Sequence, residues 1–251
     1  MTWLADPRRD RIVTNPRPVH DTDPPWKEGY RLGEQARAEL APGRGPLQSV
    51  QATLEGLGVH VAFVPFATPG VEAAAVREPL ALGLILLNSS HERVVRVPSR
   101  RSVLAHELCH LLFDATDRHL VTSVTRDTDQ GVATEQRANA FAPAFLAPRA
   151  ELDTSVEPIT LARTLVQRWA FSREGAAWYT RSLLGLPQED GPILKDRLGG
   201  TPEAPVEEPV RGASAAGVSS LVHGLVGELA RSAYDAGHIS EARLREIREL
   251  G

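Results

Sequence analysis

The chain has 251 residues, a formal net charge of -4 and no apolar run long enough to cross a bilayer. This length allows one substantial domain with appendages, and the small negative charge offers no broad surface for nucleic acid. The single cysteine, Cys109, cannot form an intramolecular disulfide, and the first residues lack the apolar segment of a signal peptide. We therefore expect a cytoplasmic protein without membrane contact.

Composition divides the chain into four parts. Residues 1–25 are rich in Pro, Asp and Arg without periodicity, which predicts a flexible arm. Residues 26–186 carry regular patterns and form the predicted main domain. Residues 187–215 are rich in Pro, Gly, Glu and Ala, as is typical of a linker, and residues 216–251 form a predicted helical segment.

Within the main domain, two predicted helices precede a group of predicted strands, and more helices follow. Ser99 is the expected N-cap of the helix that follows the strands. The order predicts an α+β fold in which a small, mostly antiparallel sheet packs on this helix. The predicted helices are about 26–40, 47–57, 100–114, 134–146, 158–170 and 172–184, and the strands are 59–65, 81–88 and 93–97.

The sequence His-Glu-Leu-Cys-His at residues 106–110 is an H-E-x-x-H motif. Side chains four residues apart share one face of a helix, so His106 and His110 can reach a single ion. Glu107 lies about 100° away around the helix, where it can hold a water rather than the metal. The opposite face is apolar, which indicates a buried active-site helix, and consists of Leu104, Ala105, Leu108, Leu111 and Leu112.

A catalytic zinc site usually has three protein ligands and an open fourth position. Glu135, at the start of a later predicted helix, is the best candidate for the third ligand. Asn139, one turn further on, could orient a histidine through a hydrogen bond. Two imidazoles and a carboxylate suit Zn²⁺ and also accept Mn²⁺. The alternative is that the two histidines are unrelated residues of an ordinary helix.

Three separated segments resemble the ImmA/IrrE family of zinc metallopeptidases. Residues 100–112 look like the metal-binding helix of that family, and residues 135–148 look like its second signature. Residues 165–177 are similar to the helix-turn-helix-like segment that follows the family's catalytic core. The chain departs from the family at Cys109, where glycine is frequent, and at Arg137, where an acidic residue is frequent.

This resemblance implies a zincin-like core and a gluzincin-type site, with His106, His110 and Glu135 as metal ligands. Glu107 would then act as the base that activates water for peptide hydrolysis. The implied substrate is a helix-turn-helix repressor, whose cleavage would derepress stress or phage-defence genes. The alternative is a non-catalytic, metal-stabilised regulator that binds a repressor or nucleic acid, although a pure binder has no need of Glu107.

Several other features have two interpretations. Cys109 could be a fourth ligand, but packing beside the site is favoured. Residues 93–97 could be an edge strand that binds substrate or an internal strand, and the two are equally supported. Arg100 and Arg101 could contact nucleic acid, but a solvated or structural role is favoured. The donor to the reaction's oxyanion stays unassigned among Tyr30, His119 and Tyr179, each of which is better explained as structural or exposed.

Overall fold

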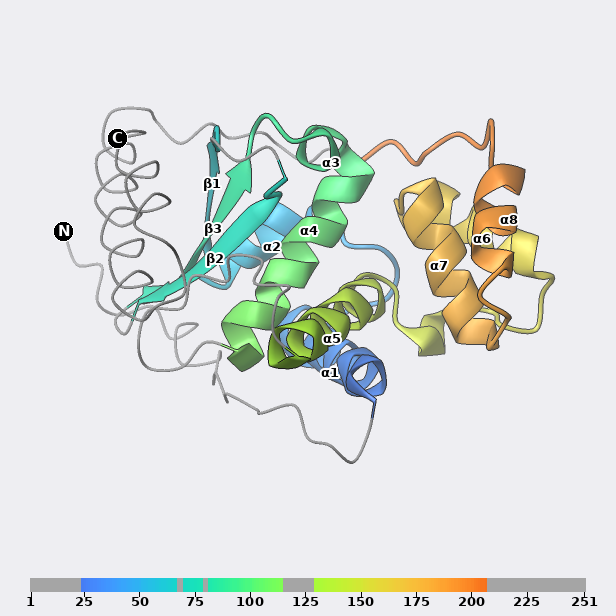
Figure 1. Cartoon of the computed structure of the whole chain (residues 1–251), viewed down its shortest axis with the longest axis horizontal. Coiled ribbons are helices and arrows are strands. Elements are labelled where there is room, and N and C mark those ends of the chain that lie inside the picture. Colours follow the sequence, from blue (N-terminus) through green and yellow to red (C-terminus); the bar gives the residue numbers. More distant parts are fainter. Residues whose placement is uncertain (1–23, 67–69, 79–80, 115–128, 207–251) are drawn as a thin grey trace.

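The computed structural model describes residues 24–66, 70–78, 81–114 and 129–206. Within these ranges the chain is an α+β structure with a three-stranded sheet and a larger set of helices (Figure 1). The predicted C-terminal segment, residues 1–23 of the predicted arm and residues 207–215 of the predicted linker lie outside the described residues. None of the described helices combines the length and apolar character needed to span a membrane.

The sheet has the order β1-β3-β2 and is mixed rather than mostly antiparallel. Strand β3 (Ala81–Asn88) is central; it pairs in parallel with β1 (His60–Val64) and antiparallel with β2 (Ala73–Glu78). The chain crosses from β1 to the far edge, forms β2, and returns through the middle as β3. Isoleucine and leucine side chains make β3 the apolar centre, with Ile85 and Leu87 fully buried.

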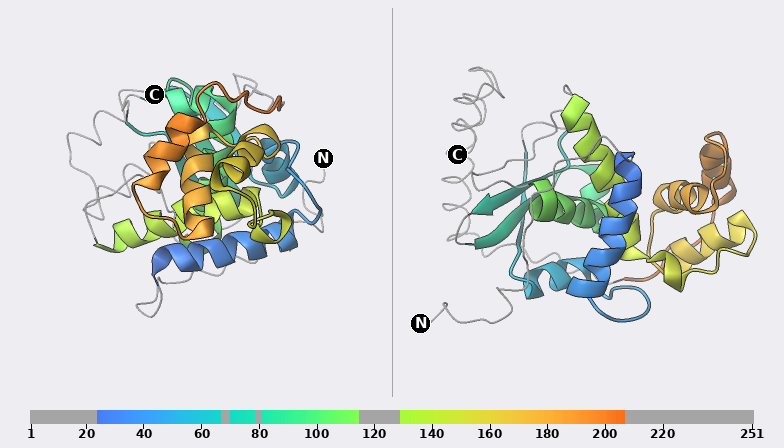
Figure 2. Two further views of the ribbon diagram at one scale, coloured as in Figure 1. Left: turned by 90° about the vertical axis from the view of Figure 1, so that its right-hand side faces the viewer. Right: turned by 90° about the horizontal axis from the view of Figure 1, so that it is seen from below.

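Helix α2 (Val50–Gly56) starts where Ser49 accepts a hydrogen bond from the Ala52 backbone N–H, a normal N-cap. Helix α1 (Pro25–Leu40) lies along α5 (Asp129–Leu146), and α5 also packs against α4 (Val97–Cys109). Figure 2 shows α1 and α5 side by side, with the sheet beyond α4.

The segment predicted as a third strand is helical, and this prediction was wrong. Residues Glu92–Val95 form the short helix α3, because the His91 side chain accepts a hydrogen bond from the Arg93 backbone N–H and caps a turn. Helix α4 then begins at Val97 with Pro98 in its first turn. Ser99 is therefore a buried residue inside the helix and not its N-cap.

At its C-terminal end α4 continues into a π-helical turn, η2 (His110–Asp114). Such turns are rare and frequently occur at functional sites. The predicted apolar face of this helix is confirmed, because all five of its members are buried: Leu104, Ala105, Leu108, Leu111 and Leu112.

Arg100 and Arg101 are buried and structural, so the nucleic-acid interpretation of this pair was wrong. The Arg101 side chain donates a hydrogen bond to the Leu47 carbonyl oxygen at 2.7 Å. The Arg100 side chain donates to the Val94 carbonyl oxygen at 2.9 Å. The two guanidinium groups join α4 to the segments that precede α2 and α4.

The remaining helices form a group on the side of α4 and α5 that faces away from the sheet (Figures 1 and 2). They are α6 (Pro158–Gln167), α7 (Arg173–Leu184) and α8 (Asp190–Arg197), preceded by the 3-10 turn η3 (Arg149–Glu151). Helix α8 lies inside the stretch predicted as a linker and packs on α7. The division of the chain into domains stays a prediction.

Candidate metal centre

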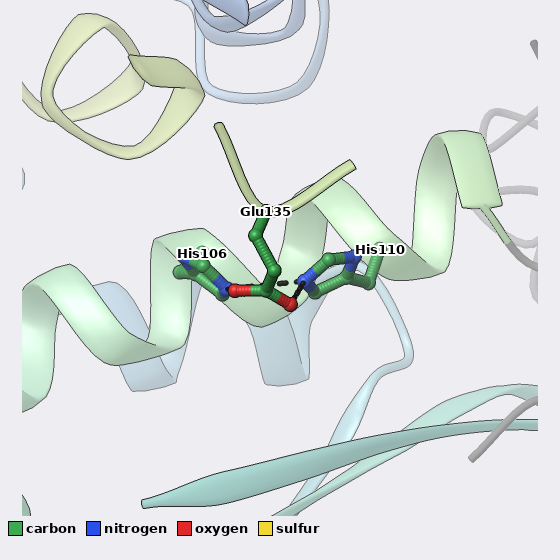
Figure 3. Close-up of side chains that lie close together, drawn as sticks. All are labelled: His106, His110 and Glu135. Carbon is green, nitrogen blue, oxygen red and sulfur yellow. Dashed lines mark hydrogen bonds and ion pairs between the residues drawn. The ribbon is translucent and has the colours of Figure 1, made fainter. Parts of the chain in front are cut away.

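Three side chains from two helices converge at one point beside the sheet. His106 projects from α4, His110 from the start of η2, and Glu135 from α5, which crosses α4 at this place. Figure 3 shows the Glu135 carboxylate between the two imidazoles, one oxygen directed towards each ring. Within the described part of the chain, these three residues form the group of His, Cys, Asp and Glu side chains that could hold a metal ion.

The distances between the donor atoms fit a tetrahedral metal. Nε2 of His106 and Nε2 of His110 are 3.0 Å apart. Glu135 Oε2 lies 3.3 Å from His106 Nε2, and Glu135 Oε1 lies 3.4 Å from His110 Nε2. Zinc ligands at about 2.0–2.1 Å define a tetrahedron with edges of about 3.3–3.4 Å. The two nitrogen–oxygen separations, each to a different oxygen of the carboxylate, match these edges, and the nitrogen–nitrogen separation is shorter.

The negative charge of Glu135 between the two imidazoles also favours the binding of a cation. Burial of the Glu135 carboxyl opposes its ionisation, but the hydrogen bonds and the charges of His106 and His110 outweigh this and lower its pKa below the ordinary value. Glu135 is therefore an anion at neutral pH. The two Nε2 atoms and the two carboxylate oxygens, with separations of 3.0–3.4 Å, repel one another unless a proton or a metal ion lies between them.

The site has a buried side and an accessible side. The His110 side chain is only 3% exposed, whereas 18% of His106 and 26% of Glu135 remain exposed. A catalytic metal needs an open coordination position for water or substrate. The accessible side at His106 and Glu135 is where such a position can exist.

Glu107, the predicted base, is buried beside His106 on α4 and is not one of the three converging residues. Its role as the base stays a prediction. Cys109 is fully buried in the hydrophobic core, and its sulfur does not belong to the group of candidate ligands. Burial raises the pKa of its thiol far above the ordinary value, which disfavours the thiolate that a metal would need.

Asn139, which was predicted to orient a histidine of the site, is exposed. The residue that contacts the His110 imidazole is instead Asp114. His110 Nδ1 lies 2.7 Å from Asp114 Oδ2, four residues further along the chain. The spacing of helix neighbours could have pointed to Asp114, because it repeats the i, i+4 relation of the two histidines. Asp114 was not among the site residues predicted from the sequence.

The structure describes Tyr30 and Tyr179, two of the three residues considered as oxyanion donors. The Tyr179 hydroxyl donates a hydrogen bond to the Ala147 carbonyl oxygen at 2.9 Å, and its ring stacks on Phe171. Tyr30 lies against the Tyr179 ring, at 5.8 Å between centroids. Both are structural residues of the core, and His119 lies outside the described residues.

Two imidazoles lie one turn apart on one helix, and a carboxylate from a second helix approaches both. This arrangement places the protein in the class with an H-E-x-x-H candidate metal centre. The particular family follows from comparison of the sequence with family models. Residues 54–177, from α2 to α7, match the model of the IrrE N-terminal-like domain, which is a peptidase family. The chain therefore belongs to the ImmA/IrrE family, as the three motifs predicted. Among curated proteins and solved structures, none matches the chain.

Proposed function

We propose that this protein is a zinc-dependent endopeptidase in which His106, His110 and Glu135 hold the metal and Glu107 is the general base. The observation that carries the proposal is the convergence of the two Nε2 atoms and the Glu135 carboxylate at separations of 3.0–3.4 Å, close to the edges of a tetrahedral zinc site. Membership of a peptidase family supports the same conclusion. The same donor set accepts Mn²⁺.

The proposed chemistry divides between the metal and the chain. A bound zinc ion supplies Lewis acidity towards the scissile carbonyl and acidifies water. Glu107 accepts a proton from the attacking water and returns it to the nitrogen of the departing amine. Its buried position beside His106 keeps the carboxylate away from bulk water, which strengthens its interactions with the reacting groups.

The proposed substrate is a helix-turn-helix transcriptional repressor, or a similar protein partner. Cleavage would release stress or defence genes from repression. This part of the proposal rests on the family resemblance of residues 100–112, 135–148 and 165–177. The net charge of -4 gives no reason to add direct binding to nucleic acid.

The test uses the full chain and the repressor encoded next to its gene. With Zn²⁺ we expect discrete repressor fragments, and a chelator should abolish them. Glu107→Gln should still bind zinc but cleave about 10²–10⁴-fold more slowly, because only the proton transfer is lost. Glu174→Gln, which changes an exposed glutamate of α7, is the matched control and should cleave normally.

Two results would contradict the proposal. Cleavage at the wild-type rate by Glu107→Gln would remove Glu107 from the mechanism. Dissociation of an intact repressor from its operator, equal in the wild type and in Glu107→Gln, would identify a metal-stabilised binder instead of a peptidase.

A further inference from the structure

Behind the candidate metal centre, Asp114 contacts the imidazole of His110 on the side away from Glu135. The 2.7 Å separation between His110 Nδ1 and Asp114 Oδ2 is that of a strong hydrogen bond, and both side chains are buried. A carboxylate only accepts hydrogen bonds, so Nδ1 must carry the proton. When the ring is neutral, the lone pair then resides on Nε2, which is the atom that faces Glu135.

The second oxygen of the same carboxylate is held by a buried arginine. Arg137 has no exposed surface and donates from Nη2 to Asp114 Oδ1. Its Nη1 forms an ion pair with Glu28 Oε2 at 3.5 Å. One guanidinium group therefore joins the π-helical turn η2, helix α5 and helix α1.

This connection joins two of the elements that carry the candidate ligands. His110 and Asp114 belong to η2, whereas Glu135 and Arg137 belong to α5, two residues apart. The Asp114–Arg137 pair thus holds η2 to α5 beside the point where His110 and Glu135 approach each other. Glu28 adds support from α1, which precedes the residues matched by the family model.

We propose that Asp114 and Arg137 are positioning residues of the metal centre, with Glu28 as the outer member of the network. Asp114 holds His110 in the tautomer whose Nε2 can bind a metal, and Arg137 fixes the orientation of the Asp114 carboxylate. The proposal rests on the proposed metal site. It also gives a role to Arg137, the position at which the family often has an acidic residue.

The first test measures the Zn²⁺ affinity of the full chain by competition with a chromogenic chelator. Asp114→Asn keeps the size of the side chain but removes its charge, and we expect zinc affinity to fall about 10–100-fold. Arg137→Met should lower it similarly. Arg137→Lys should retain more affinity than Arg137→Met, because an ammonium keeps the charge although it cannot reproduce the planar fork.

The matched control is Arg101→Met. Arg101 is equally buried, and its hydrogen bonds include those to the carbonyl oxygens of Leu47 and Gln48, in the segment before α2. Its loss should lower the melting temperature as the loss of Arg137 does, yet leave zinc affinity unchanged. Wild-type zinc affinity in both Asp114→Asn and Arg137→Met would show that the network only stabilises the fold.

A second readout needs no metal. In the zinc-free protein at mildly alkaline pH, nitrogen NMR should show His110 as the Nδ1–H tautomer, and Asp114→Asn should add the Nε2–H tautomer. An unchanged tautomer would overturn the role of Asp114. If the wild type binds no Zn²⁺, the proposed function fails, and this spectrum still tests the positioning of His110 separately.

Discussion

Gly33 of α1 lies so close to Phe141 of α5 that a Cβ atom at position 33 would be 2.5 Å from the Phe141 carbonyl oxygen. The Ala144 methyl group and the Phe145 amide nitrogen would be 2.9 Å and 3.0 Å away. Two of these three contacts are backbone atoms of a packed helix, which cannot rotate away. The close contact of α1 with α5 therefore requires glycine here.

Gly33→Ala should consequently destabilise the protein by about 1–3 kcal/mol, because separating the helices costs more than the higher helix propensity of alanine contributes. Gly56→Ala, at the end of α2 where the new methyl meets open space, is the control and should be neutral or slightly stabilising. Chemical denaturation measures both free energies of unfolding. Equal stability of Gly33→Ala and the wild type would show that α1 can move away without cost.

Zinc should stabilise the folded chain through the three converging side chains. At a free concentration of about 100 times the dissociation constant, binding to the folded state adds about 2.7 kcal/mol. Glu135→Ala should remove most of this gain, since it removes the anionic donor between His106 and His110. Glu174→Ala on the surface of α7 should keep it. Thermal unfolding with and without Zn²⁺ is the measurement, and an equal zinc-induced shift in both variants would exclude Glu135 as a ligand.

The Cys109 thiol should be unreactive in the folded protein. It is fully buried, and burial raises its pKa, so the reactive thiolate is scarce at neutral and mildly alkaline pH. A thiol reagent should label the chain only after unfolding in denaturant. Rapid labelling of the native protein would mean that the end of α4 opens readily to solvent.

Tyr179 should contribute to stability and not to catalysis. Tyr179→Phe keeps the ring stacked on Phe171 but removes the hydrogen bond to Ala147, leaving a buried carbonyl oxygen without this donor. We expect a loss of about 1–3 kcal/mol in the free energy of unfolding. The cleavage rate of the folded variant should equal that of the wild type. A large fall in that rate without a loss of stability would instead assign the hydroxyl to the reaction.

Local pattern predicted much of the fold. The helix at 26–40 and the strands near 59–65 and 81–88 were predicted close to their observed bounds, because their apolar periodicity is strong. Strand β2 was missed, since the alanines that begin it have little strand preference, and it forms because β3 offers an edge to pair with. The valines at 94, 95 and 97 favoured a strand, but the cap at His91 and Pro98 made this segment helical.

The pairing of the two imidazoles follows from the order of the amino acids alone, because residues four apart face the same side of any helix. The sequence also identified Glu135 as a candidate, through its place at the start of a later helix and through the family resemblance. The charged residues behind the site could be identified only in the folded chain. Arg137 reaches Asp114 over 23 residues of sequence and Glu28 over 109, and no local rule relates such positions. Their meeting depends on how α1 and α5 pack on the helix that carries the histidines.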